Sequence, residues 1–241
     1  MNCRRLRLNG GHAMHIHLPK SLHGWRDFLK EVGIIVIGVL IALGAEQFVQ
    51  SWHWRHETEA AHQALEREAG DNLQGAFQRS EQQSCADQRL EEIGLVFAAH
   101  AAGRPIHLSG PIGRPMAYYG SIDVWQVEVA SQALTHMPLD QKLAFTTAFS
   151  NYENFNSVLR LEQDAWLRLD VLDSLDQLEP GDWPPLRQAY AQARSLNSRL
   201  RIITGQILSS LTLGQVPKQL DDQPSGVRLG IASFCKPLRI Q

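Results

Sequence analysis

The chain has 241 residues, of which 23 are basic and 25 acidic, and 44% are hydrophobic. This composition is typical of a folded chain and excludes an intrinsically disordered one, while the formal net charge of −2 lacks the basic excess of a nucleic-acid-binding protein. Good helix formers dominate after residue 50 and strand-like alternation is hard to find, so we expect an all-α protein.

The N-terminal tail contains two candidate start sites. A Gly-Gly pair lies just before Met14, and purine-rich codons for such a pair resemble a bacterial ribosome-binding site. We therefore expect translation to begin at Met14, with residues 1–13 a mis-assigned extension; the alternative is a real, flexible cytoplasmic tail. His12, His15 and His17 have no Cys or carboxylate beside them, and we expect no metal site there.

An apolar segment follows the tail. The run from Val32 to Ala45 contains no charged or polar side chain, and apolar flanks extend it to residues 28–49. As a helix this stretch would be about 33 Å long, close to the roughly 30 Å of a bilayer core. Tryptophans near both ends resemble an interfacial aromatic belt (Trp25, Trp52 and Trp54). We expect 28–49 to be a transmembrane helix.

The distribution of Lys and Arg predicts its orientation. Six basic residues precede the apolar run that begins at Val32, whereas the stretch just after the span holds two, Arg55 and Arg67. The positive-inside rule then places residues 1–27 in the cytoplasm and the rest on the periplasmic or extracytoplasmic side of a bacterial inner membrane. Three alternatives stay open: a signal peptide cleaved near Ala42-Leu43-Gly44, a buried core helix, and a span of opposite orientation.

Small residues mark one face of the span. Gly38 and Ala42 are four apart, and Ala45 falls on nearly the same face. Such a face lets two helices approach closely, which suggests a homodimer through the membrane helix. The alternative is that these residues have no special role, since small residues are common in spans.

The remaining sequence predicts a helical extracytoplasmic domain over residues 50–213. The expected helices cover 60–77, continuing the membrane helix, then 85–100, a short helix with Asp123 as N-cap, 139–178, and a last helix opened by Pro184 and Pro185. Together they predict an N-terminal transmembrane helix continuing into an antiparallel helical bundle. We expect residues 214–241 to form an irregular C-terminal tail.

The segment from Leu22 to Glu57 reads LHGWRDFLKEVGIIVIGVLIALGAEQFVQSWHWRHE. It resembles the opening of a family of bacterial single-pass membrane proteins of unknown function, which have a short basic tail, an acidic residue before an Ile/Val/Gly-rich span, and Glu or Gln after it. Ser131 to Phe155 resembles the family's helical part more loosely. The resemblance implies an anchor and a helical domain, and it brings no activity and no functional residues.

A Gly-Pro-rich loop over residues 103–121 is the candidate site. Loops of this length in compact domains are often functional, and its polar residues suggest binding of a ligand or partner: Arg104, His107, Arg114, Tyr118 and Tyr119. The alternative is a lid that packs its tyrosines on the bundle.

Other patterns carry less chemistry. Asp170, Asp173, Asp176 and Glu179 recur every three residues, and we interpret them as a solvated helix face because they lack the order of a calcium loop. We assign no catalytic residue, metal or cofactor, since the sequence contains no GxSxG, Walker A, GxGxxG or CxxC motif.

Cys85 and Cys235 both lie beyond the span, where an oxidising compartment favours a disulfide; two unrelated buried cysteines are the alternative. The functional hypothesis is a membrane-anchored interaction or adaptor module that binds an unknown protein partner. The alternative is an enzyme or small-ligand sensor with an unrecognised site near the 103–121 loop.

Overall fold

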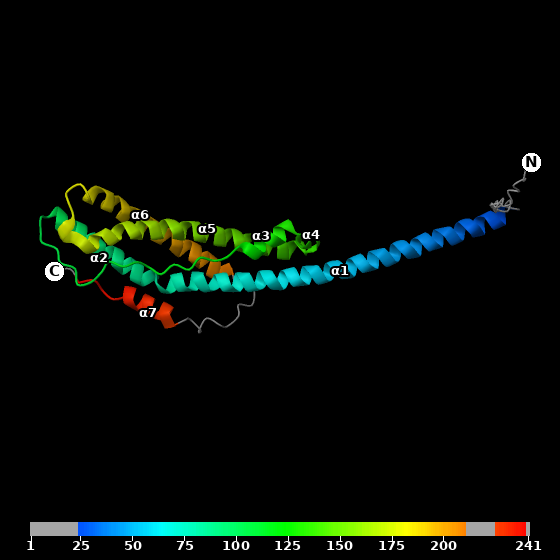
Figure 1. Ribbon diagram of the computed structural model, residues 1–241, viewed down its shortest axis with the longest axis horizontal. Coiled ribbons are helices and arrows are strands. Elements are labelled where there is room, and N and C mark those ends of the chain that lie inside the picture. The colour runs from blue at the N-terminus through cyan, green and yellow to red at the C-terminus, as the bar shows by residue number, and fades with distance from the viewer. Residues whose placement is uncertain (1–23, 211–224, 240–241) are drawn as a thin grey trace, which may run out of the picture. The chain divides into compact units, whose positions relative to one another are not determined.

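The computed structural model describes residues 24–210 and 225–239, and within them helices account for nearly all regular structure (Figure 1). The chain divides into two compact units, Met1–His53 and Trp54–Gln241. The expected basic tail up to residue 23, the start at Met14, and the segment 211–224 lie outside the described residues.

Helix α1 covers Trp25–Glu81, and its first part holds the expected span. An 18-residue window there has a mean hydropathy of 2.3 and none of it is buried within the chain, so the helix is long and apolar enough to cross a membrane. Gly38 would have no atom within 4 Å of an added Cβ, and Ala42 and Ala45 are exposed. The helix–helix contact through these three residues stays a prediction.

The second unit is the predicted all-α bundle. The second part of α1 packs in one core cluster with α5 (Leu139–Leu169) and α6 (Trp183–Ser210), and α2 (Gln83–Ala101) packs with the same two helices in another. Helices α3 (Asp123–Ala130) and α4 (Ala133–His136) are short. The expected stripe on α1 is buried at Leu65, Ala69 and Leu73, although Ala76 takes the buried place expected for Phe77. The apolar face of each helix thus forms the core, as its period predicts.

Helix α2 continues the course of α1 after a single break at Gln82. Arg79 of α1 and Asp87 of α2 contact the same residue, Asn197 of α6, and farther along α2 the ring of His100 stacks on Trp183 at the start of α6. Both α1 and α2 therefore run antiparallel to α6. Helix α5 runs parallel to α1, because Tyr152 contacts Ala69 and Glu162 contacts Arg79.

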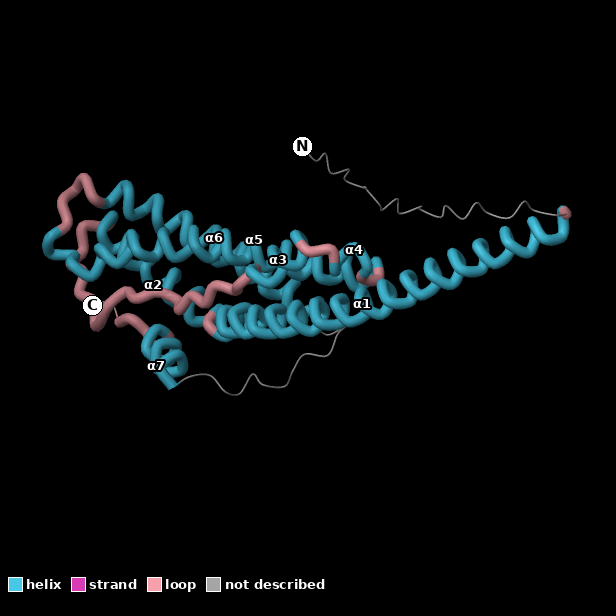
Figure 2. Tube along the Cα trace, turned by 45° about the vertical axis from the view of Figure 1, so that its right-hand side comes forward, coloured by secondary structure: helices cyan, strands magenta, loops and turns pink. Residues whose placement is uncertain are grey.

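A long extended stretch, Ala102–Ile122, connects the end of α2 to the start of α3, and we call it the return segment. Figures 1 and 2 show it running back along the bundle. The start of α3 is tied to Glu68 on α1, which lies 33 residues before Ala101, or about 50 Å along the helices. Only an extended connection of roughly twenty residues covers that distance, at about 3.3 Å per residue. The expected loop over 103–121 is confirmed.

Three expectations need correction. The helix expected over 139–178 is α-helical only to Leu169, and Asp170–Gln177 forms a 3₁₀ segment, η1. Asp123 is the first residue of α3 and not its N-cap; its N–H donates to Ser121 Oγ at 3.1 Å. The tail expected to be irregular over 214–241 contains a helix, α7 (Ser225–Phe234). Phe234, which ends α7, is buried and meets the Trp166 ring edge-on.

Candidate functional site

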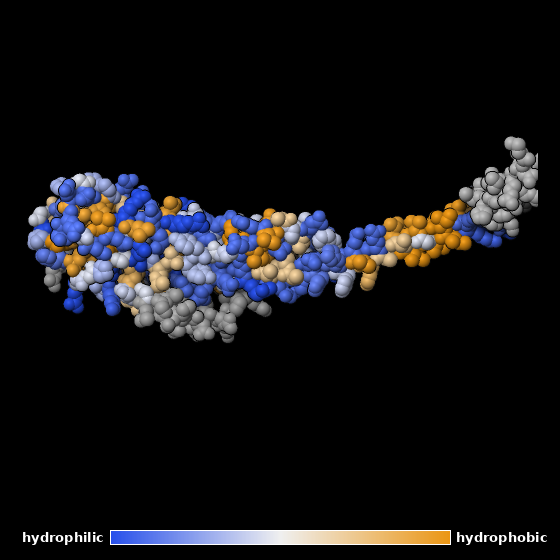
Figure 3. Space-filling model, in the orientation of Figure 1, coloured by the Kyte–Doolittle hydropathy of each residue, from blue (hydrophilic) through white to orange (hydrophobic). Residues whose placement is uncertain are grey.

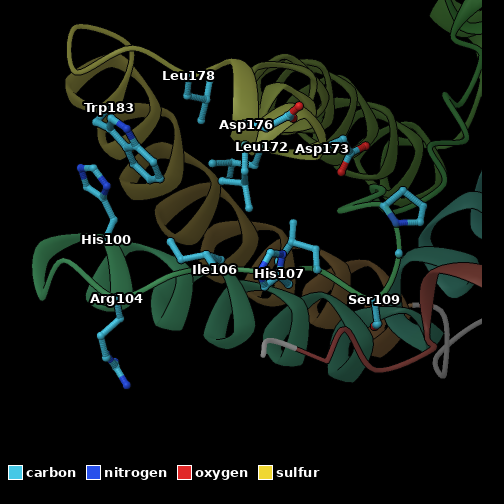
Figure 4. Close-up of a pocket in the computed structure, with 14 residues that line it drawn as sticks. His100, Arg104, Ile106, His107, Ser109, Leu172, Asp173, Asp176, Leu178 and Trp183 are labelled. Carbon is cyan, nitrogen blue, oxygen red and sulfur yellow. The ribbon is translucent and has the colours of Figure 1, made fainter.

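The return segment, η1 and the ends of α2 and α6 enclose an open cleft of about 890 Å³ (Figure 4). Buried and half-buried apolar side chains form part of its inner surface: Ile106, Leu108, Leu172, Leu175 and Leu178. Charged or polar side chains border it at Arg104, His107, Asp173 and Asp176, all of which are exposed. The cleft therefore combines several apolar side chains with a larger polar surface that carries both charges.

One wall of the cleft is an aromatic stack. The His100 ring lies flat on the Trp183 indole, with centroids 3.5 Å apart and planes inclined by 8°. Phe97 meets the same indole edge-on at 5.9 Å. Trp183 is in this place because it opens α6 directly after the Pro180-Gly181 turn, and Phe97 and His100 lie three apart on one face of α2. The stack is rigid on its inner side and partly open to solvent at His100.

The opposite wall carries the acidic residues of η1. A 3₁₀ helix has three residues per turn, so side chains three apart point the same way. Asp173 accepts a hydrogen bond from the Ile112 N–H at 2.6 Å, and Asp170, one turn earlier, pairs with Arg114 at 3.0 Å. These carboxylates thus hold the return segment, which is a more specific role than the solvated face that the sequence suggested.

Asp170 is an unusual carboxylate. Its Oδ1 atom is buried and has no hydrogen-bond partner in the described structure, while Oδ2 faces Arg114. Burial raises the pKa of Asp170 above its usual 3.8; the Arg114 guanidinium lowers it in part, and the neighbouring Asp173 raises it. The charged form is therefore disfavoured here despite the ion pair.

The structure separates the five residues of the predicted loop site. Arg104 and His107 line the cleft, although the Arg104 side chain points away from the aromatic stack (Figure 4). Arg114 pairs with Asp170 beyond the cleft, and Tyr118 and Tyr119 lie farther along the return segment. The tyrosines pack on the bundle, as the alternative interpretation of the loop proposed.

The two tyrosines have close neighbours on the helices. A Cβ on Gly75 of α1 would lie 2.5 Å from the Tyr118 ring, so only glycine admits that ring. The Arg160 guanidinium lies 5.9 Å from the centre of the Tyr119 ring. These contacts fix the segment and leave both rings about half exposed.

Side chains of the helices hold the return segment by its backbone. The amide of Gln82 both donates to and accepts from Met116, and the amide of Asn156 does the same with Gly120. Near the far end, Glu68 accepts hydrogen bonds from the N–H groups of Val124 and Trp125 at 3.0 Å and so caps α3. The backbone of the segment is thus held by hydrogen bonds, as the backbone of a β-strand is, but here the partners are side-chain amides and carboxylates of the helices.

The C-terminal segment is attached to α2 and to the return segment. The structure joins Cys85 to Cys235, with their Cα atoms 4.8 Å apart. The buried Arg89 guanidinium donates to the carbonyl oxygens of Phe234 and Lys236 and, on its other side, to that of Pro111. Arg89 and the disulfide therefore connect α2, the return segment and the end of α7. A thiol count remains the test of the disulfide in the native protein.

Sequence reasoning missed most of the cleft. His100, Asp173, Asp176 and Trp183 come from three elements, and no spacing in the sequence relates one element to another. The signals were the three-residue repeat that contains Asp173 and Asp176, and Trp183 itself, a large aromatic directly before the Pro-Pro pair at the start of α6. Across residues 24–210 and 225–239, no group of three or more His, Cys, Asp and Glu side chains could hold a metal ion.

Comparison with known proteins adds no name to this arrangement: no protein-family model, curated protein or solved structure matches the chain.

Proposed function

We propose that this protein is a membrane-anchored interaction module, in which the first part of α1 holds the helical bundle at the membrane and the cleft binds a segment of a protein partner. The observation that carries the proposal is the cleft: it is open, it places several apolar side chains beside an aromatic stack, and exposed charges of both signs border it.

The form of the cleft favours a peptide segment over a small molecule. Small-ligand sites enclose most of the ligand surface, whereas this cleft is open along one side and its ionisable side chains are solvated. Protein interfaces typically combine apolar side chains and aromatic anchors with a polar rim, and all three are present here. An apolar side chain of the partner would lie over Leu172 and Leu175, while His107 and Asp176 would pair with its polar groups.

The anchor is supported by the mean hydropathy of 2.3 in α1 and by the excess of Lys and Arg before it. On this proposal the bundle lies outside the cytoplasm of a bacterial cell, where the Cys85–Cys235 bond is stable. A reporter fused after Gln241 should be active only in the periplasm, and the chain should resist alkaline extraction from membranes. Recovery in the soluble periplasm would indicate a cleaved signal peptide instead.

Photo-crosslinking tests the cleft. A benzophenone amino acid at His107 should give a discrete adduct in native membranes, and the same group at Ser157, which is exposed on α5, should not. Gly110 lines the cleft with open space around its Cβ position, so Gly110→Trp should fill the cleft without a clash and abolish the adduct. Gly205→Trp is the matched control, because Gly205 also has open space but lies outside the cleft. An adduct that persists in Gly110→Trp would overturn the proposal, as would turnover of a small molecule that Gly110→Trp blocks.

A further inference from the structure

Four large apolar side chains are exposed at one end of the bundle, on α3 and at the start of α5. Val127 is 64% exposed, Val129 56%, Leu139 67% and Leu143 56%, and we call this set the apolar corner. Figure 3 shows apolar surface gathered where α3 lies. Single exposed leucines are ordinary, but four within a stretch this short form a surface that favours an apolar partner.

The apolar corner lies at the end of the bundle that contains Trp54. The Trp54 indole stacks on the His136 ring, with centroids 4.1 Å apart and planes inclined by 19°. His136 ends α4, and Leu139 opens α5 three residues later. About two turns further along α1, the His62 ring meets Phe145 edge-on at 5.3 Å. The first turns of α5 are therefore fixed against the first turns of α1 in this unit.

Chain length then limits how far this end can be from a membrane. Val49 is the last apolar residue of the expected span, and Trp54 lies only five positions later in the chain. Five residues reach at most about 18 Å even when fully extended, whatever the arrangement of the two units. If the span is in the bilayer, the end of the bundle at Trp54 and His136 lies within that distance of the hydrocarbon.

We propose that the apolar corner inserts into the interface of the same bilayer that holds the span. The proposal rests on the membrane anchor of the preceding subsection. Apolar faces of this kind lie about 5–10 Å deep, at the boundary between headgroups and acyl chains. The nearby charges are of both signs, as at Asp140 and Lys142, so the partner is the apolar part of the interface and not an anionic headgroup.

The test compares two leucines of the same helix. In the full chain carrying Cys3→Ser, an environment-sensitive nitrobenzoxadiazole label is placed on Leu139→Cys or on Leu167→Cys. Leu167 is 50% exposed and lies 28 residues later, about 42 Å further along α5. Each protein is reconstituted into phosphatidylcholine vesicles, with or without lipids that carry a nitroxide on the acyl chain.

At Leu139→Cys we expect a blue-shifted emission and a loss of about half of the fluorescence with nitroxide lipids, because the label would lie at the boundary between headgroups and acyl chains. At Leu167→Cys we expect neither effect. Val129→Asp with Leu143→Asp should reduce the quenching at Leu139→Cys and leave the melting temperature unchanged. If both labels show the same emission and the same quenching, in vesicles that retain the protein after an alkaline wash, the proposal for the apolar corner is overturned but the membrane anchor is not. A blue shift without quenching would also overturn it, because a protein surface then covers the corner. Loss of the protein in the wash would overturn the anchor as well.

Discussion

The buried ion pair between Arg79 of α1 and Glu162 of α5 should contribute more to stability than any exposed pair of the bundle. The two side chains are 2% and 0% exposed, and the guanidinium contacts both carboxylate oxygens, at 2.6 and 3.2 Å. Asn197 accepts a further hydrogen bond from Arg79 at 2.7 Å. Arg79→Met removes the cation that contacts this carboxylate and leaves a buried charge without that compensation.

Removing one partner of such a pair costs about 3–5 kcal/mol, and in a domain of this size each kcal/mol lowers the melting temperature by about 2–4 °C. We therefore expect Arg79→Met to lower the melting temperature by about 6–20 °C. Arg79→Met combined with Glu162→Leu removes both charges, so its loss should be smaller than the sum of the two single losses. Thermal unfolding of the full chain in a nonionic detergent, followed by tryptophan fluorescence, measures all three variants.

Arg168 and Asp164 provide a matched control on α5. Their closest N–O distance is also 2.6 Å, but the two side chains are 56% and 58% exposed. Because exposed pairs typically contribute less than about 1 kcal/mol, Arg168→Met should leave the melting temperature almost unchanged. The reasoning fails if Arg79→Met and Arg168→Met have equal effects, or if the losses at Arg79 and Glu162 simply add.

Three further predictions concern the contacts around the cleft. Because burial raises the pKa of Asp170, the protonated form favours the fold: its contribution is complete below the ordinary pKa of 3.8 and is lost as the pH rises through the higher folded value. Asp170→Asn should therefore melt higher than the wild type at pH 7, with a difference that shrinks at pH 3; a lower melting temperature at pH 7 would show that the Arg114 pair dominates. Glu68→Gln should lower the free energy of unfolding by about 1–3 kcal/mol, because one amide oxygen cannot replace the two carboxylate oxygens that accept hydrogen bonds from α3. Urea unfolding measures this change, and Glu66→Gln is the control: Glu66 is 62% exposed on the same helix, so its replacement should leave the free energy of unfolding unchanged. Unreduced, denatured protein should show no free thiol at Cys85 or Cys235, and since the bond closes a loop of 150 residues, reduction should cost up to about 5 kcal/mol; two free thiols by mass-labelling would contradict the bond.

The sequence predicted the helices well where apolar periodicity or a strong breaker defined them. Leu90, Ile93 and Phe97 form the buried face of α2 as their spacing indicates, and Pro180-Gly181 lies between η1 and α6. The change from α-helix to 3₁₀ at Asp170 was less visible. The acidic residues repeat every three positions, which fits three residues per turn better than 3.6, but a charged face on an α-helix gives nearly the same pattern.

The candidate site was much less predictable, because its contacts join residues far apart in the sequence. Asn156 and Gly120 are 36 residues apart, Gln82 and Met116 are 34 apart, and each contact pairs a side-chain amide with backbone atoms. An amide side chain can pair with the backbone N–H or carbonyl of any residue type. The partner position therefore carries no characteristic residue by which the sequence could reveal the contact. The Cys85–Cys235 pair was the exception, since a disulfide requires cysteine at both ends.

The return segment is long because α2 continues the direction of α1. A long loop suggests function because short loops suffice to join neighbouring helices. Here α2 continues the direction of α1 and does not turn back beside it, so the chain must return about 50 Å before α3 can begin beside Glu68. Length alone therefore does not mark this loop as a binding site, and Tyr118 and Tyr119 are explained by packing on the bundle. The cleft lies where the segment has left α2 and ends at Pro111, whose carbonyl oxygen Arg89 holds, so Arg104 and His107 border it together with the apolar side chains of η1.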